Sequence, residues 1–135
     1  MTLERFQRIS KQLIWRDGSE MEYKWHIFLA NLDPVIGSEQ GKTRPVLVIS
    51  QEAINQILPV VNVLPITTRK PGKIYPNEVL IHAGVGGLEE ESIVLCYQVK
   101  TLDKKRLMKE IGKIDDWELQ EAIIDALCFQ LEIIK

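Results

Sequence analysis

Several features that identify common classes of protein are missing from this sequence. No apolar run approaches the ~20 residues that a membrane-spanning helix needs, and the N-terminal residues lack the hydrophobic segment of a secretory signal. Cysteine is scarce: Cys96 and Cys128 both lie among apolar residues, so we expect buried free thiols rather than a disulfide. These absences predict a cytoplasmic protein with no membrane contact.

The residues needed for several familiar kinds of catalysis are absent as well. The histidines, His26 and His82, are far apart, and no cysteine or histidine pair has metal-ligand spacing. No Gly-x-Ser-x-Gly motif of a serine hydrolase occurs. The glycines of residues 84–87 are followed by three glutamates, which would repel phosphate, instead of by the lysine of a phosphate-binding loop. We therefore predict that the protein uses no metal and no cofactor.

Length and charge restrict the remaining possibilities. A chain of 135 residues can bury one core without disulfides or metals, which predicts one globular domain. The net charge of −2, from 17 basic and 19 acidic residues, argues against a general nucleic-acid coat. It does not exclude an RNA enzyme, because local basic groups can supply phosphate contacts. Three basic groups occur. The first two, which could converge on one groove, are Lys42 with Arg44, and Arg69 with Lys70 and Lys73. The third, interpreted as solvated surface, consists of Lys100, Lys104, Lys105, Arg106 and Lys109.

The first 20 residues differ from the rest. Apolar residues recur there at near-helical spacing with basic residues between them, and the Asp-Gly pair at 17–18 is typical of a turn. The pattern predicts an N-terminal extension, 1–20, with a short helix that packs on the domain of residues 21–135 or on a partner. The alternative is that Met21 is the natural start and residues 1–20 are an upstream read-through. The apolar positions are Leu3, Phe6, Ile9 and Leu13.

From residue 27 onwards the sequence is mostly of β type. Short runs rich in Val, Ile and Leu, separated by Gly, Pro, Asn and Asp, are typical of the strands of a small barrel or sandwich. We predict strands at residues 27–32, 45–50, 60–66, 78–81 and 93–99. A helical turn near 104–108 and one more short strand at 110–114 follow.

The clearest helix lies at the C-terminal end. Asp115 is a suitable N-cap, and Glu118 three residues later would complete a capping box. Apolar residues then follow at helical spacing and predict a face that packs on the strands. The fold class is therefore mainly β with a C-terminal α-helix. The predicted face consists of Trp117, Ile123, Leu127 and Leu131, with Ala122 and Ala126 beside them.

The most informative stretch is residues 30–50, ANLDPVIGSEQGKTRPVLVIS. A polar, turn-rich loop lies there between an apolar run and a strand that reads as buried. Arg44 lies where the loop meets the strand. A charged side chain in that place is held by the scaffold, as expected of a phosphate-binding or catalytic group.

This stretch resembles the MazF/PemK toxin family, small bacterial endoribonucleases of toxin–antitoxin pairs. The resemblance is carried by Leu-Asp-Pro at 32–34, Gly-Ser-Glu-Gln-Gly at 37–41 and Arg-Pro-Val-Leu-Val at 44–48. Further similar strings lie at 66–68, 92–95 and 98–104. It covers about residues 21–135, and a match of several parts in the right order is specific. It implies the SH3-like small β-barrel of the PemK/CcdB group.

The resemblance also implies which residues act. In the family an Arg directly before Pro-Val and a Thr near the end of the third strand form the catalytic pair, and the matching residues are Arg44 and Thr67. A nuclease without a metal must use the 2′-OH of RNA as nucleophile, which leaves a 2′,3′-cyclic phosphate and a 5′-OH. Arginine suits phosphate binding, and a threonine hydroxyl can donate to a non-bridging oxygen. Glu39 is a candidate base or orienting group, or else a solvated loop residue. A role for His82 as base has no support.

Neighbouring residues are candidates for RNA contacts. The loop offers donors and acceptors for unstacked base edges, and its glycines allow close approach, although a flexible hairpin would explain the glycines equally well. The partners implied by the resemblance are single-stranded mRNA, a second copy of the chain in a homodimer, and a cognate MazE-like antitoxin. The candidates are Ser38, Gln40, Gly41, Lys42, Thr68, Arg69 and Lys70.

Two other functions remain open. CcdB-like toxins on the same barrel bind a protein target such as gyrase and are not enzymes, and a barrel that has lost activity would only bind partners. Trp25 and His26 keep the second alternative open, because the family usually has Gly-Asp before the first strand. The presence of both Arg44 and Thr67 favours the endoribonuclease.

Overall fold

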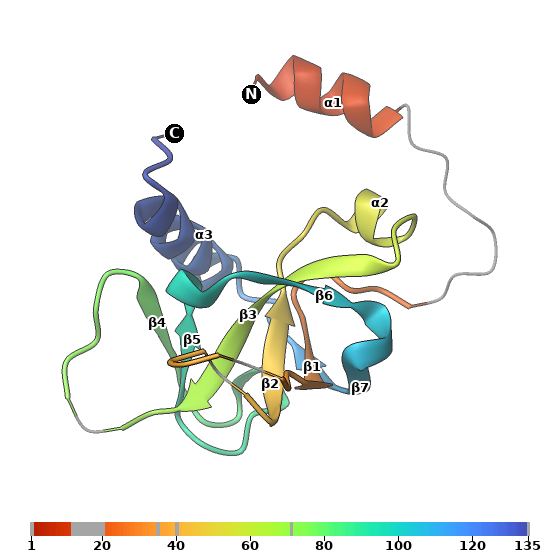
Figure 1. Ribbon diagram of the computed structural model, residues 1–135. Coiled ribbons are helices and arrows are strands. Elements are labelled where there is room, and N and C mark those ends of the chain that lie inside the picture. The colour runs from red at the N-terminus through yellow and green to blue at the C-terminus, as the bar shows by residue number, and fades with distance from the viewer. Residues whose placement is uncertain (1, 12–20, 35, 40, 71, 135) are drawn as a thin grey trace.

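The computed structural model describes residues 2–11, 21–34, 36–39, 41–70 and 72–134. Within them, an antiparallel sheet has the strand order β4-β5-β3-β2-β1-β7, and β6 pairs with β3 beside this path (Figure 1). The strands are β1 His26–Asn31, β2 Thr43–Val48, β3 Val60–Thr68, β4 Glu78–Ile81, β5 Ser92–Leu95, β6 Lys100–Asp103 and β7 Leu107–Lys113. The helices are α1 Leu3–Lys11, α2 Glu52–Asn55 and α3 Trp117–Leu131, with 3₁₀ turns η1 Val85–Gly87, η2 Cys96–Gln98 and η3 Lys104–Arg106.

The predicted β character is confirmed, and one strand needs correction. The segment predicted as a strand at 93–99 stops at Leu95, turns through η2, and resumes as β6, which the sequence did not predict. The reason is that both halves of this segment pair with β3: β5 pairs with its last residues and β6 with its first. The two registers are offset, and η2 takes up the offset. The strand predicted at 110–114 is the last part of the longer β7.

The predicted barrel is not closed by strand pairing, because β4 and β7 end the strand order in the described part of the chain. η1 packs against β7 near this opening, and the two backbones approach through glycines. A Cβ on Gly112 would lie 2.5 Å from the carbonyl oxygen of Gly86, and one on Gly87 would lie 2.4 Å from that of Ile111. Only glycine fits such a contact, so these residues set how near η1 comes to the sheet.

Alternation along the strands gives the sheet two apolar faces. One includes Ile27, Leu47 and Leu64, and α3 covers part of it with Ile123 and Ala126. The other includes Phe28 and Ala30 of β1, Val46 and Val48 of β2, Val61 and Val63 of β3, and Leu102 of β6. We call the second one the β6 face. This face matters for function because the candidate site residues lie on the same strands, β2 and β3, beyond its valines.

The C-terminal helix is confirmed, with two corrections. Its N-cap is Asp116, whose side chain accepts a hydrogen bond from the Glu118 N–H at 3.0 Å, and not the predicted Asp115. Trp117 and Leu131, predicted to pack, are 65% and 49% exposed. The buried stripe is formed by Leu119, Ile123, Ala126 and Leu127.

The N-terminal helix is confirmed as α1, but it does not pack on the domain within the described residues. Leu3, Phe6 and Ile9 stay exposed, and Figure 1 shows α1 away from the sheet. The predicted Leu13 and the turn at 17–18 lie outside the described residues. In the described segments, no helix is both long enough and apolar enough to cross a membrane.

Trp25 lies in a backbone conformation that normally selects glycine. Its φ is +69°, in the left-handed region that bulky side chains avoid. Two backbone hydrogen bonds hold it there: its N–H donates to Val48 at 2.8 Å, and its carbonyl accepts from Ile114 at 2.8 Å. Its ring packs on the core under α3. Despite the departure from the family pattern, β1 therefore begins at His26.

A glutamate on α2 secures the chain just before this point. The Glu52 carboxylate accepts from the backbone N–H groups of Tyr23 and Lys24, each at 3.0 Å, and from the side chains of Asn55 and Gln56. Partial burial opposes its ionisation, but these four donors outweigh burial and hold the pKa of Glu52 below its usual 4.5.

Replacing Glu52 by Gln should therefore lower stability in a pH-dependent way. At neutral pH we expect a loss of about 1–3 kcal/mol, nearer the lower value because the group is partly exposed. A carboxylate with a depressed pKa stabilises the fold above its unfolded pKa and loses that effect as pH falls through its folded pKa. The deficit of Glu52→Gln should thus shrink well below pH 4.5. Urea unfolding across pH, with the exposed Glu121→Gln as control, measures this; a deficit independent of pH would contradict it.

Candidate functional site

Arg44 is the second residue of β2, half-buried at the end of the β6 face. Its Nε donates a hydrogen bond to the carbonyl oxygen of Gly41 at 3.2 Å. Because this bond uses Nε, the two terminal nitrogens of the guanidinium can still form a fork toward a phosphate. The backbone of β2 and a bond to the preceding loop thus fix the direction of the side chain.

Arg44 and Thr67 lie at the same end of β2 and β3. The two strands pair from Val48 with Val63 to Val46 with Pro65, and Arg44 and Thr67 each come two residues beyond the last of these pairs. Both side chains fall on the β6 face, since they continue the alternation of Val46 and Val63. The register thus directs the two residues that the sequence predicted as a catalytic pair to the same face and the same end of β2 and β3.

The loop between β1 and β2 is fastened at its base. Leu32 and Lys42 pair through their backbones at 2.8 Å, and Asp33 Oδ1 accepts from the Lys42 N–H at 2.7 Å. Arg106 donates from its guanidinium to the carbonyl oxygens of Asn31 and Asp33. Asp33 therefore does more than end the first strand, because it also closes the loop that leads to Arg44.

Glu39 closes the same loop from the other end. Its Oε1 accepts from the Ile36 N–H at 3.1 Å, and its Oε2 lies 4.0 Å from Lys100 Nζ on β6. The Lys100 side chain is only 18% exposed, so the prediction that it belongs to a solvated run is wrong for this residue. In the described part of the chain, the contacts of the Glu39 carboxylate are with these groups and not with Arg44 or Thr67. These contacts hold the Glu39 carboxylate against the backbone of its own loop and against β6.

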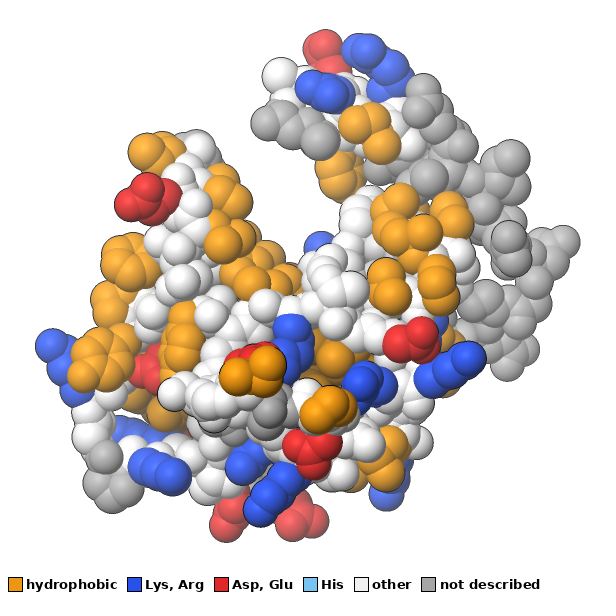
Figure 2. Space-filling view, in the orientation of Figure 1, with side chains coloured by type: hydrophobic (Ala, Val, Ile, Leu, Met, Phe, Trp, Pro, Cys, Tyr) orange, Lys and Arg blue, Asp and Glu red, His pale blue; other side chains and the backbone are white. Residues whose placement is uncertain are grey.

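Thr67 lines a cleft of about 270 Å³ on the open side of β3 and β5. Ile93 and Leu95 of β5 line it too, and both are buried. Lysine and tyrosine side chains also line it, and the left side of Figure 2 shows basic beside hydrophobic side chains over the loop from β3 to β4. Those residues are Lys70, Lys73, Tyr75 and Tyr97.

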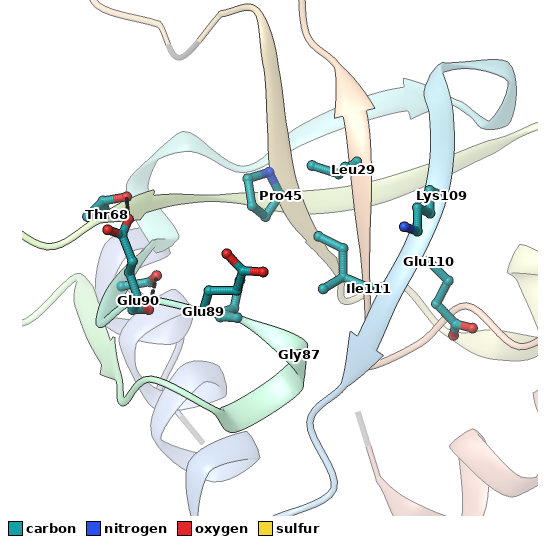
Figure 3. Close-up of a pocket in the computed structure, with 11 residues that line it drawn as sticks. Leu29, Pro45, Thr68, Gly87, Glu89, Glu90, Lys109, Glu110 and Ile111 are labelled. Atoms are coloured by element: carbon teal, nitrogen blue, oxygen red, sulfur yellow. Dashed lines mark hydrogen bonds between the residues drawn. The ribbon is translucent and has the colours of Figure 1, made fainter.

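Thr68 and Arg69 lie near acidic groups instead. Thr68 follows Thr67 in a strand and therefore points to the opposite face, where its hydroxyl lies 3.3 Å from Glu90 Oε2 (Figure 3). Arg69 forms an ion pair with Glu91 at 2.6 Å, and this hydrogen bond is the main cause that lowers the pKa of Glu91. The pocket drawn in Figure 3 also holds Glu89, which disfavours phosphate there.

The other residues predicted to contact RNA differ in exposure and in location. Ser38 and Lys42 are exposed, Gly41 is half-buried beneath Arg44, and Lys70 lines the cleft beside Thr67. Gln40 lies outside the described residues. Both cysteines are free thiols as predicted; burial raises the pKa of Cys96 to about 12, whereas Cys128 is partly exposed.

Three residues of the site were missed by the sequence reasoning: Lys100, Tyr75 and Tyr97. A signal existed for Tyr97, because residues 93, 95 and 97 alternate along the predicted strand and so share a side with Thr67. No pattern marked Tyr75, which comes from the loop before β4, or Lys100, which follows the unpredicted turn η2.

Comparison with known proteins gives a consistent result. A family model described as PemK-like, MazF-like toxin of type II toxin-antitoxin system matches residues 23–130. Endoribonuclease EndoA of Bacillus subtilis (strain 168) is 39% identical over 108 residues, which cover 80% of this chain and 92% of that protein.

Solved structures of similar fold agree. Mycobacterium tuberculosis toxin MazF-mt6 superposes with a TM-score of 0.68 and 29% identity, over 82% of this chain and 99% of the other. A MazE-MazF structure from Deinococcus radiodurans gives a TM-score of 0.66 and 27% identity, over 83% of this chain and 96% of that one.

Proposed function

The chain belongs to the PemK-like, MazF-like family of type II toxins, and we propose that it cleaves single-stranded mRNA with Arg44 and Thr67 as its catalytic pair. It is an endoribonuclease toxin, as its similarity to EndoA indicates, and its partner is a cognate antitoxin, as in the MazE-MazF relative. The observation that supports the catalytic proposal is the register of β2 and β3, which directs Arg44 and Thr67 to one face at the same end of the two strands.

Cleavage would use the 2′-OH of the substrate, the donors of this face and solvent water. The 2′-OH gives its proton to water as its oxygen attacks the phosphorus and forms a new P–O bond, while the bond to the 5′-oxygen breaks and that oxygen takes up a proton from water. Negative charge grows on the non-bridging oxygens during this step. The Arg44 fork and the Thr67 hydroxyl would bind those oxygens, and Arg44 would donate a hydrogen bond toward the leaving 5′-oxygen. The products would be a 2′,3′-cyclic phosphate and a 5′-OH.

RNA contacts would come from both sides of this pair. On one side, Ser38, Gly41 and Lys42 belong to the loop that leads to Arg44; on the other, Lys70 lines the cleft beside Thr67. Thr68 lines the cleft as well, although its hydroxyl also bonds Glu90, whereas Arg69 is held in an ion pair with Glu91. A homodimer in the cytoplasm completes the proposal.

Removing either catalytic side chain should abolish most of the activity. In EDTA, the wild type should cut a long single-stranded RNA at discrete sites and leave 5′-OH ends. Arg44→Ala and Thr67→Val should each lower the initial rate by about 10²–10³-fold, because each removes a preorganised donor to the transition state. Primer extension locates the cuts, and end-labelling identifies their chemistry.

The matched control is Thr101→Val, which changes an exposed threonine on β6 that bonds Asn62. It should cleave as the wild type does. Full activity of Arg44→Ala would contradict the catalytic proposal. A folded wild-type protein that cleaves no RNA would instead favour a toxin acting on a protein target.

Glu39 should be dispensable as a proton acceptor. In Glu39→Gln the amide oxygen can still accept from the Ile36 N–H, so the loop should keep its shape and the rate should stay within about tenfold of wild type. Loss of a general base would cost about 10²–10⁴-fold. The pH–rate profile of the variant provides the second readout: its acid limb should match that of the wild type. If Glu39→Gln instead lost about 10²–10⁴-fold in rate and its pH–rate profile had no acid limb, Glu39 would be the general base.

A further inference from the structure

The cleft beside Thr67 contains two tyrosines that the cleavage step does not use. Tyr75 and Tyr97 line it together with Thr67, and both also line an adjoining cavity that continues to Phe129 on α3. Their side chains are 56% and 42% exposed. Such rings offer flat apolar faces to a ligand while their hydroxyls stay in water.

Hydrogen bonds hold the backbone of Tyr75 and that of Cys96, the residue before Tyr97. The Tyr75 N–H donates to Glu78 Oε1 at 2.9 Å, and the Tyr75 carbonyl accepts from the Glu78 N–H at 2.9 Å. Cys96, next to Tyr97, donates from its N–H to Asn77 at 3.0 Å, which ties η2 to the turn before β4. The two rings therefore come from one hydrogen-bonded unit and not from separate mobile loops.

Charge divides the cleft into two parts. Thr67, Lys70 and Lys73 line only the part next to the catalytic pair, where cations favour phosphate. The tyrosines line the part shared with the adjoining cavity, and Glu78 lies there with them, where its carboxylate would repel phosphate. Lys73 lies between the basic part and the aromatic part of the cleft, with its Nζ 5.8 Å from the centre of the Tyr75 ring.

We propose that Tyr97, assisted by Tyr75, stacks one unpaired base of the RNA, the one next to the phosphate held by Arg44 and Thr67. A basic strip beside aromatic rings is the usual arrangement for binding single-stranded nucleic acid, because every base has a π-face. The site deepens the proposed function and rests on it. It fixes how the RNA lies: backbone along Lys70 and Lys73, and one base turned toward α3.

The test combines a tyrosine variant with a substrate that lacks the base. After the wild-type cut site has been mapped, a short RNA containing it is prepared in intact form and with an abasic nucleotide on either side of the scissile phosphate. On intact RNA, Tyr97→Ala should raise KM by about tenfold or more, the scale of a lost base–aromatic stack, with a smaller effect on kcat. Tyr97→Phe should behave as the wild type, and Tyr97→Leu as Tyr97→Ala.

The decisive result is the coupling between the two changes. At one of the two flanking positions, the missing base should raise the KM of the wild type by about the same factor as Tyr97→Ala does. The same abasic RNA should not raise the KM of Tyr97→Ala any further. Trp117→Ala removes an exposed aromatic ring at the start of α3, away from the residues that line the cleft, and should leave both effects unchanged. Melting temperatures of all variants establish that they are folded.

Two outcomes would overturn this site while leaving the nuclease intact. One is an unchanged KM for Tyr97→Ala, including the case in which that variant loses only antitoxin binding. The other is an abasic effect in Tyr97→Ala as large as in the wild type. Failure of the wild type to cleave any RNA would overturn the proposed function and this site with it.

Discussion

The register between β2 and β3 is the constraint on which the candidate site depends. Pairing of Val46 with Pro65 and Val48 with Val63 directs Arg44 and Thr67, each two residues beyond the ladder, to the same face. A slip of one residue would turn either side chain to the opposite face, because side chains alternate along a strand. The valines that fix this register belong to the core of the β6 face, so burial of apolar surface sets the direction of both proposed catalytic residues.

Basic and acidic groups both lie close to the cleft. Thr67 and Thr68 line it together with two lysines, and the Thr68 hydroxyl lies 3.3 Å from Glu90 Oε2. Glu91 neutralises Arg69, and Lys100 neutralises Glu39, so the charges next to the catalytic pair are largely matched. A chain with a net charge of −2 can therefore still present a local phosphate-binding surface. Figure 2 agrees: basic side chains form separate groups on this face.

Much of the fold could be predicted from the sequence, whereas the pairing of Arg44 with Thr67 comes from the family resemblance and stays a prediction. Strand character and the C-terminal helix follow from local patterns, and the position of Arg44 at the mouth of a strand follows from the loop before it. What escaped prediction depends on long-range pairing. η2 interrupts a run that reads as one strand, because that run must pair with both ends of β3. Lys100 of β6 is only 18% exposed at its side chain and lies 4.0 Å from Glu39 Oε2, a contact between distant segments that no local pattern predicts. The cap at Asp116 was missed by one residue, since two adjacent aspartates fit the same pattern.

The central claim is that Arg44 and Thr67 act on one phosphate, and a double-mutant cycle tests it most directly. Cleavage rates would be measured in EDTA for the wild type, Arg44→Ala, Thr67→Val and the double variant. Residues that act as a unit give strongly non-additive effects, so the double variant should be about as slow as the slower single variant. If the two losses multiply instead, Arg44 and Thr67 act independently, and the arrangement that the register creates is not the catalytic site.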